Sequence, residues 1–308
     1  MNIFLLVLSL PTQNSSARMR VWRALKSCGA AVLRDGVYVL PDSISTLGNM
    51  QSIADDVISN EGTALIVQAQ ALSALDIPAL FDRREDYEAL HAQIQKLSTE
   101  LIIDKKEDAL KQSRKLRKHL QALIEIDFFP SELQLQISHR LHQLELTIAR
   151  LGEHHEPVFI EGSIPRLKVE NFQNQVWATR QRPWVDRLAS AWLIKRFIDP
   201  AATILWLETP EDCPANALGF DFNGAMFSHV DHYVTFEVLM HRFSLETPAL
   251  KQLANIVHFL DVGGIQPTEA AGIERVLQGL RSSITDDNQL LLLAGHLFDG
   301  LHSSFEGK

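Results

Sequence analysis

Hydrophobic and polar positions in the first 80 residues follow the periods of strands and helices in turn. Short apolar runs, typical of buried strands, alternate with stretches in which apolar residues recur every three to four positions, as in a helix. The pair Asp35-Gly36 between two apolar runs predicts a hairpin turn. We expect strand, helix, strand, strand, helix and strand over residues 2–10, 17–28, 31–33, 37–40, 44–59 and 63–70. This order predicts a ferredoxin-like domain over residues 1–80.

Good helix formers fill residues 81–152, with almost no Gly or Pro. The helical pattern is broken at Phe128-Phe129-Pro130, and Ser131 offers a new helix start, so this segment predicts a helical hairpin.

A polar stretch with Gly and Pro at residues 152–165 marks a boundary, and residues 166–308 predict a mostly α-helical C-terminal domain. We expect a short strand at 175–179 and helices at 186–198, 235–243, 248–260, 268–280 and 287–302. The fold class is therefore α+β.

Composition is that of an ordinary globular protein. The chain has 308 residues, 46% hydrophobic and 22% charged, which is enough for two domains. The apolar run at residues 3–10 is far shorter than the roughly 20 residues that a membrane-spanning helix needs. Cys28 and Cys213 lie far apart and form neither a CxxC motif nor a disulfide framework. We therefore expect a cytoplasmic protein that does not contact a membrane.

The distribution of charge is more informative than the net charge of −9. Residues 1–80 hold five Lys/Arg and six Asp/Glu, residues 81–150 hold twelve of each, and residues 151–308 hold twelve against twenty. Six of the twelve histidines also follow residue 228. A region rich in both carboxylates and imidazoles favours a bound cation over nucleic acid.

Three arginines surround the start of the helix expected at residues 186–198. Arg180 and Arg182 precede this helix, and Arg187 lies in its first turn. Guanidinium groups beside helix N-terminal amides can hold a tetrahedral oxyanion. The arginines could instead form ion pairs with acidic neighbours such as Asp186, and both alternatives stay open.

Histidine and carboxylate residues recur at residues 227–241. His229 is expected in a turn, and Glu237 and His241 on one face of the next helix. Such a set without Cys favours Fe, Mn, Zn or Ni as a bound divalent metal. A structural role is the alternative, since Glu237 in a first helical turn is favourable by itself.

A second pair, His258 and Asp261, shares one face of an otherwise apolar helix. Buried ionisable groups either pair with one another or coordinate metals. The two residues could therefore form an ion pair, or join His229 and Glu237 in a four-residue metal site. Weaker candidates for this site are Asp186, Glu269 and His296.

Other chemistry has little support in the sequence. The motifs GxGxxG, GxxxxGK[ST], GxSxG and HExxH are absent, which disfavours nucleotide-binding and serine-hydrolase functions. Basic residues that could contact DNA phosphates occur on two expected helices, at Arg18, Arg20, Arg23 and Lys26 and at Lys111, Arg114, Lys115, Arg117 and Lys118. A solvated basic face without a ligand is the alternative, and no helix-turn-helix pattern is evident.

Together these motifs resemble those of ChrB-type chromate-resistance proteins. Residues 177–200, 227–239, 255–262 and 269–280 resemble the C-terminal chromate-resistance domain of that family in order and spacing. Residues 20–41 and 126–133 are similar to its N-terminal domain, so the resemblance spans nearly the whole chain. Val234 departs from the pattern, because relatives often have a Cys there that could bind a metal or undergo redox chemistry.

The resemblance implies a chromate-responsive regulator of a chromate-efflux operon, with chromate or a similar oxyanion and operator DNA as partners. The N-terminal pattern is also similar to PaaX-type repressors and to small CRISPR adaptation nucleases. PaaX-type proteins carry a winged helix before this domain, whereas this chain begins with the first strand. We therefore expect other surfaces to bind operator DNA, if it is bound at all.

The sequence thus predicts a homodimeric, chromate-responsive regulatory protein. Chromate would be held by Arg180, Arg182 and Arg187, and a divalent metal by His229, Glu237, His258 and Asp261. DNA contacts are expected from Arg18, Arg20, Arg23, Lys115 and Lys118. Two alternatives stay open: a metal-dependent redox enzyme acting on chromate or reactive oxygen, and a dimeric scaffold without catalysis.

Overall fold

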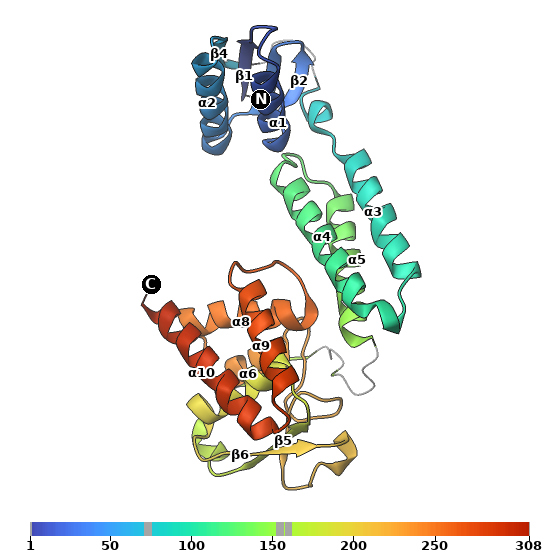
Figure 1. Cartoon of the computed structure of the whole chain (residues 1–308), viewed down its shortest axis with the longest axis vertical. Helices are drawn as coiled ribbons and strands as arrows, with labels where there is room; N and C mark the ends of the chain where they lie inside the picture. The colour runs from blue at the N-terminus through green and yellow to red at the C-terminus, as the bar shows by residue number, and fades with distance from the viewer. Residues whose placement is uncertain (1, 71–75, 152–156, 158–161, 308) are drawn as a thin grey trace. The chain divides into compact units, whose positions relative to one another are not determined.

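The computed structural model describes residues 2–70, 76–151, 157 and 162–307. Within these ranges the chain is mixed α/β and mostly helical, with ten α-helices and two small sheets (Figure 1). It divides into two compact units, Met1–Lys96 with Lys115–Leu141 and Leu97–Arg114 with His142–Lys308. The start of the predicted boundary, at Gly152, lies outside the described residues. Every described helix is too short or too polar to cross a membrane.

The N-terminal unit contains the six elements in the predicted order. They are β1 (Asn2–Ser9), α1 (Ser15–Ser27), β2 (Ala31–Arg34), β3 (Val37–Pro41), α2 (Ile44–Ser59) and β4 (Thr63–Gln70). The strands form one antiparallel sheet in the order β2-β3-β1-β4. Gly36 turns the β2–β3 hairpin at a φ of +73°, where an added Cβ would lie 2.6 Å from the carbonyl oxygen of Leu8. Glycine is therefore required at this turn.

Side-chain caps and an apolar core position the two helices on this sheet. Asn14 accepts the backbone N–H of Ala17 and caps α1, and Ser43 caps α2 in a capping box with Thr46. The buried core is built from both helices, the sheet and a following turn, with members that include Phe4, Leu6, Val21, Leu25, Val39, Met50, Val57 and Phe81.

The middle segment differs from the predicted hairpin because it holds three helices. These are α3 (Arg84–Thr99), α4 (Lys106–Glu125) and α5 (Glu132–Arg150). The break between α3 and α4 contains Ile102, which adopts an extended conformation before a short 3₁₀ turn. The sequence signals this break only weakly, since two β-branched isoleucines replace the usual Gly or Pro.

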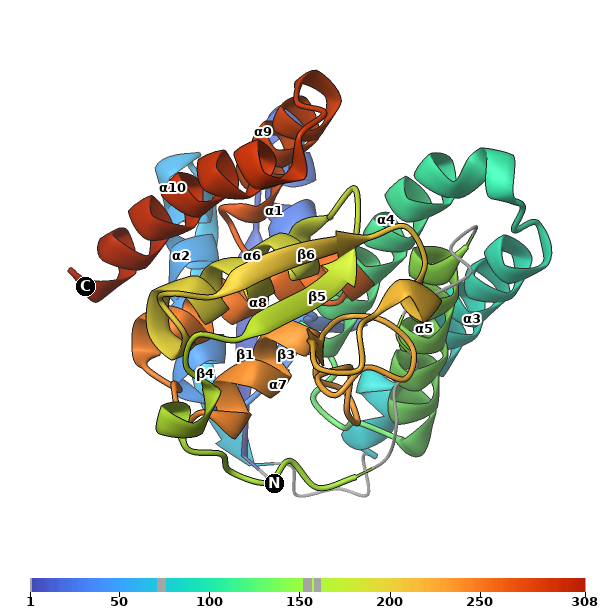
Figure 2. The ribbon, with the colours of Figure 1, turned by 90° about the horizontal axis from the view of Figure 1, so that it is seen from below.

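The C-terminal unit is built on a short parallel sheet. Its strands are β5 (Val176–Arg180), β6 (Thr203–Leu207) and β7 (Leu218–Gly219), in the order β6-β5-β7. Helix α6 (Val185–Leu193), extended by a π-helical turn η4 (Ile194–Ile198), connects β5 to β6. Strand β5 was predicted, but β6 and β7 were not. In Figure 2, helices α6 and α8 lie behind the ribbons of β5 and β6.

Four further helices complete this unit close to their predicted bounds. They are α7 (Thr235–Arg242), α8 (Pro248–Val262), α9 (Ala270–Ser283) and α10 (Asp287–Glu306). Shorter 3₁₀ turns are η1 (Pro78–Phe81), η2 (Ile103–Lys105), η3 (Val169–Phe172) and η5 (Pro210–Asp212). Helix α6 is buried along its whole length because it packs against α7, α8 and α10.

The carboxylate of Asp199 ties the start of β5 to the end of the α6 crossover. It is completely buried and accepts the backbone N–H groups of Asn174 and Gln175, both at 2.9 Å, and the indole N–H of Trp177 at 3.2 Å. Three donors, of which the Trp177 indole is buried, therefore depend on one buried carboxylate, and they fix the strand that ends at Arg180.

We expect Asp199→Ala to lower the free energy of unfolding by about 3 kcal/mol or more, because it leaves these donors without an acceptor. Urea unfolding followed by tryptophan fluorescence measures the effect, since four of the five tryptophans lie in the C-terminal unit. The exposed Glu170 provides a control, and Glu170→Ala should change stability by less than about 0.5 kcal/mol. Equal effects of the two substitutions would contradict this role of Asp199.

Candidate functional site

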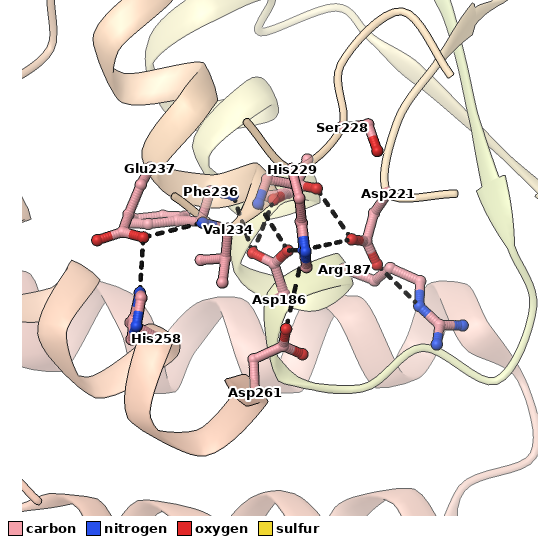
Figure 3. Close-up of polar contacts among 12 residues, drawn as sticks. Asp186, Arg187, Asp221, Ser228, His229, Val234, Phe236, Glu237, His258 and Asp261 are labelled. Atoms are coloured by element: carbon pink, nitrogen blue, oxygen red, sulfur yellow. Dashed lines mark hydrogen bonds and ion pairs between the residues drawn. The ribbon is translucent and has the colours of Figure 1, made fainter. Parts of the chain in front are cut away.

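His229 lies at the centre of a buried cluster of charged side chains. Its Nε2 atom is 3.3 Å from Asp186 Oδ2, 3.5 Å from Asp221 Oδ1 and 3.8 Å from Asp261 Oδ2 (Figure 3). The side chains of His229, Asp186 and Asp221 are each at most 4% exposed, and that of Asp261 is 17% exposed. One imidazole nitrogen thus faces three carboxylates from separate parts of the chain.

The parallel sheet explains how these parts meet. Arg180 is the last residue of β5, Asp186 and Arg187 lie in the first turn of α6, and Asp221 follows β7 by two residues. The carboxyl ends of neighbouring parallel strands lie at one edge of a sheet, which is where α/β folds form binding crevices. The loop from β7 to α7 then brings His229 to the same edge.

Asp186 connects α6 to the start of α7. Its Oδ2 accepts the backbone N–H of Thr235 at 3.0 Å, and its Oδ1 accepts that of Phe236 at 2.9 Å. These are N–H groups that a helix start leaves without an intrahelical acceptor. A side chain from another helix therefore caps α7, and its negative charge is favourable at the positive end of the α7 dipole.

Asp221 contacts both Arg180 and Arg187. Its Oδ2 is 3.2 Å from Arg187 Nε, its Oδ1 accepts the Thr235 hydroxyl at 2.9 Å, and its backbone carbonyl accepts Arg180 Nη2 at 3.3 Å. The backbone at Asp221 has a φ of +56°, which is uncommon for a residue with a side chain. Such conformations cluster at functional sites.

Burial and neighbouring charges shift the pKa values in opposite directions. Burial by itself would lower the pKa of His229, but hydrogen bonds with Asp186 and Asp221 outweigh burial and raise it to about 10. Burial, followed by repulsion from Asp221, raises the pKa of Asp186. Burial also opposes ionisation of Asp221, yet its contacts with His229 and Arg187 hold its pKa below the ordinary value. His229 and Asp221 thus form a charged pair.

The cluster opens into a cavity. Asp186, Arg187, Asp221, His229 and Asp261 all belong to the lining of a partly open cavity of about 1300 Å³ in the C-terminal unit. A small ion that entered this cavity would therefore contact carboxylate oxygens as well as the Arg187 guanidinium.

Two of the three arginines predicted to bind an anion lie at this cluster. Arg180 and Arg187 both contact Asp221, whereas Arg182 lies apart from it. Arg182 has a φ of +52°, and its guanidinium donates to the backbone carbonyl oxygens of Arg281 and of Ile284, the latter at 2.8 Å. It therefore binds the C-terminal end of α9.

The four residues of the predicted metal site separate into two groups. His229 and Asp261 join the cluster described above, whereas His258 Nδ1 lies 2.8 Å from Glu237 Oε2 in a separate pair (Figure 3). Glu237 also accepts the backbone N–H of Val234 at 2.9 Å. The structure does not bring the four residues together, because His258 and Asp261, although on one helix face, reach different neighbours.

Asp186 was predicted only as a weaker candidate for the metal site, and Asp221 was not predicted. Of the other weak candidates, Glu269 and His296 are exposed. A signal for Asp186 was available, because a carboxylate in the first turn of an otherwise mostly apolar helix is expected to be buried with a partner. For Asp221 the missing signal was strand β7, which is only two residues long.

The residues predicted to contact DNA lie in the N-terminal unit. Arg18, Arg23, Lys115 and Lys118 are exposed on α1 and α4. Arg20 instead forms two hydrogen bonds with Asp56, at 2.9 and 2.7 Å. Its charge is therefore already balanced within the protein.

Comparison with known proteins identifies the family. The family described as ChrB, C-terminal domain, matches residues 177–305, and that described as Protein ChrB, N-terminal, matches residues 18–162. The chain belongs to the ChrB family. It is 40% identical over 305 residues to Protein ChrB of Cupriavidus metallidurans strain CH34, covering 98% of this chain and 94% of that protein. The comparison with solved structures found no match.

Asp186 and Asp261 should differ in their effect on stability. We expect Asp186→Asn to lower the free energy of unfolding by about 3 kcal/mol, because it breaks a buried charge pair and weakens the cap of α7. Asp261→Asn, in a more exposed residue, should cost less than about 1 kcal/mol. Urea unfolding of both variants measures the difference, and a larger loss for Asp261→Asn would contradict the described anchoring of α7.

Proposed function

We propose that this protein is a chromate-responsive regulatory protein of a chromate-resistance operon. The observation that carries the proposal is the cluster in which Arg187 and His229 surround Asp221 at a cavity of the C-terminal unit. Family membership supports a role in chromate resistance. Ligand binding at the cavity would change the affinity of the N-terminal unit for DNA by favouring one of two conformations.

The oxyanion would bind through Arg187, with Arg180 in support. Guanidinium groups match the paired oxygens of tetrahedral oxyanions, and a cavity raises the strength of such contacts by excluding water. Arg187 already pairs with Asp221, so an entering dianion would compete with this carboxylate. Competition of this kind would shift the loop that carries His229 and thereby the start of α7.

DNA would bind through α1. Residues 1–80 contain five Lys/Arg, and four of them lie on this helix. Because Asp56 neutralises Arg20, we propose that Arg18 and Arg23 contact the phosphates. Lys115 and Lys118 are further candidates, and the predicted homodimer would present two such surfaces to one operator.

The N-terminal unit is proposed to be ferredoxin-like. Its element order and its antiparallel sheet, read as β4-β1-β3-β2, support this assignment.

A redox enzyme is the second candidate. It is favoured by a buried histidine that lies within 4 Å of three carboxylates at the edge of a cavity, an arrangement able to hold a reactive metal. Turnover of chromate by purified protein, abolished in the His229→Gln variant, would favour this alternative over the sensor.

The sensor is tested by chromate-dependent DNA binding. We expect chromate to change the affinity of the wild-type protein for promoter DNA of its own operon, and Arg187→Ala and His229→Gln to bind the DNA without responding to chromate. Arg196→Ala is the control, because Arg196 is 62% exposed and pairs only at the surface with Asp299. A gel-shift titration measures these effects. Unchanged DNA binding by wild-type protein at saturating chromate would overturn the sensor function.

The DNA surface is tested by the dependence of affinity on salt. Arg18→Ala and Arg23→Ala should each weaken DNA binding and reduce the slope of log K against log salt by about one, as expected for one lost phosphate contact. Arg20→Ala should leave the slope unchanged, because Arg20 is paired with Asp56. Equal slopes for all three variants would place the DNA contacts elsewhere.

A further inference from the structure

We infer that Asp186, His229 and Asp261 bind one divalent metal ion, and that the oxyanion binds to this ion. The metal site is inferred from the geometry of the three side chains alone. Only its link to the oxyanion rests on the proposed function. This set shares His229 and Asp261 with the sequence prediction but replaces Glu237 and His258 with Asp186.

The separations between the three potential ligand atoms fit one coordination sphere. His229 Nε2 lies 3.3 Å from Asp186 Oδ2 and 3.8 Å from Asp261 Oδ2, and all three ligand atoms lie within 4.8 Å of one another. Ligand bonds of about 2.0–2.2 Å in a tetrahedral sphere place ligand atoms about 3.3–3.6 Å apart. Only a small movement of Asp261, the most exposed of the three, would complete the sphere.

Neighbouring groups hold the potential ligands in place. The backbone N–H groups of Thr235 and Phe236 orient the Asp186 carboxylate. Asp221, which is 3.5 Å from His229 Nε2, is itself fixed by Arg187 and by the Thr235 hydroxyl. Hydrogen-bonded supports of this kind fix the ligands in protein metal sites and are important for affinity.

The other His–carboxylate contact does not offer the same arrangement. Glu237 and His258 supply two side chains, and within the described part of the chain the only group of three or more potential ligands is the one around His229. The Glu237–His258 pair therefore provides a matched comparison, with the same chemistry but an incomplete ligand set.

The charge of the cluster explains why an oxyanion would need the metal. The carboxylates of Asp186, Asp221 and Asp261 lie around His229 and repel a dianion there, and Arg187 and Arg180 offset only part of this negative charge. A divalent cation would reverse the local potential. Three protein ligands would leave at least one coordination position open, as in catalytic metal sites, and the cluster lies on the cavity wall. One imidazole and two carboxylates favour Mn²⁺, Fe²⁺ or Zn²⁺ over soft metals.

Metal binding is tested on the full-length chain. Protein stripped with EDTA and dialysed against Mn²⁺ or Zn²⁺ should retain one ion per chain by elemental analysis. Co²⁺ should give a visible absorption spectrum that changes when the oxyanion molybdate is added. Asp261→Asn should weaken metal binding by about 100-fold or more, since loss of a supporting group alone costs 10- to 100-fold. Glu237→Gln should bind as the wild type does.

Asp261 is the chosen position because Asp186 also caps α7, so that an Asp186 variant could lose the metal through misfolding. Circular dichroism of Asp261→Asn verifies that it is folded. Wild-type protein that retains no ion, or equal metal loss in Asp261→Asn and Glu237→Gln, would overturn the metal site. A chromate response that persists in EDTA-stripped protein would overturn the link to the oxyanion while leaving the sensor function intact.

Discussion

The carboxylate of Asp186 is the group on which the polar structure of the C-terminal unit depends. It lies in the first turn of α6, and it accepts the two backbone N–H groups at the start of α7 and contacts His229. A buried carboxylate is unfavourable unless donors and cations surround it. Asp186 therefore fixes the positions of α7 and of the His229 loop, because their displacement would leave its charge uncompensated.

The same constraint places the cluster where several helices of the unit meet. His229, Arg187 and three carboxylates lie between the cavity and an apolar core, in which Phe227, Val234 and Phe236 are fully buried. Electrostatic interactions are strong where water is excluded, so adding one ion would redistribute the contacts of every group. Helices α6, α7 and α8 each carry or contact a member of the cluster, and packed helices move as rigid elements. Binding at this point can therefore affect much of the unit.

Most of the local structure follows from short-range features of the chain. Helix α2 and strand β4 have their predicted bounds, and α7, α8, α9 and α10 begin or end within a few residues of theirs. Local capping, turn residues and apolar periodicity control these elements, so they can be read along the chain. Family membership was also evident from the order of the motifs. The break before α4 was missed because it lacks Gly and Pro, and β7 was missed because it is only two residues long. Strand β6 was missed although Pro200 and Pro210 flank it.

Which charged residues contact one another depends on the tertiary structure. His258 and Asp261 are neighbours on α8, yet one pairs with Glu237 and the other faces His229, because α8 passes between two different partners. Arg182 is close in sequence to Arg180 but binds the end of α9, since its positive φ turns it away from the sheet edge. Asp221 enters the cluster through the parallel pairing of β5 and β7. Such partnerships depend on contacts between residues distant in the chain, and spacing along the sequence does not encode them.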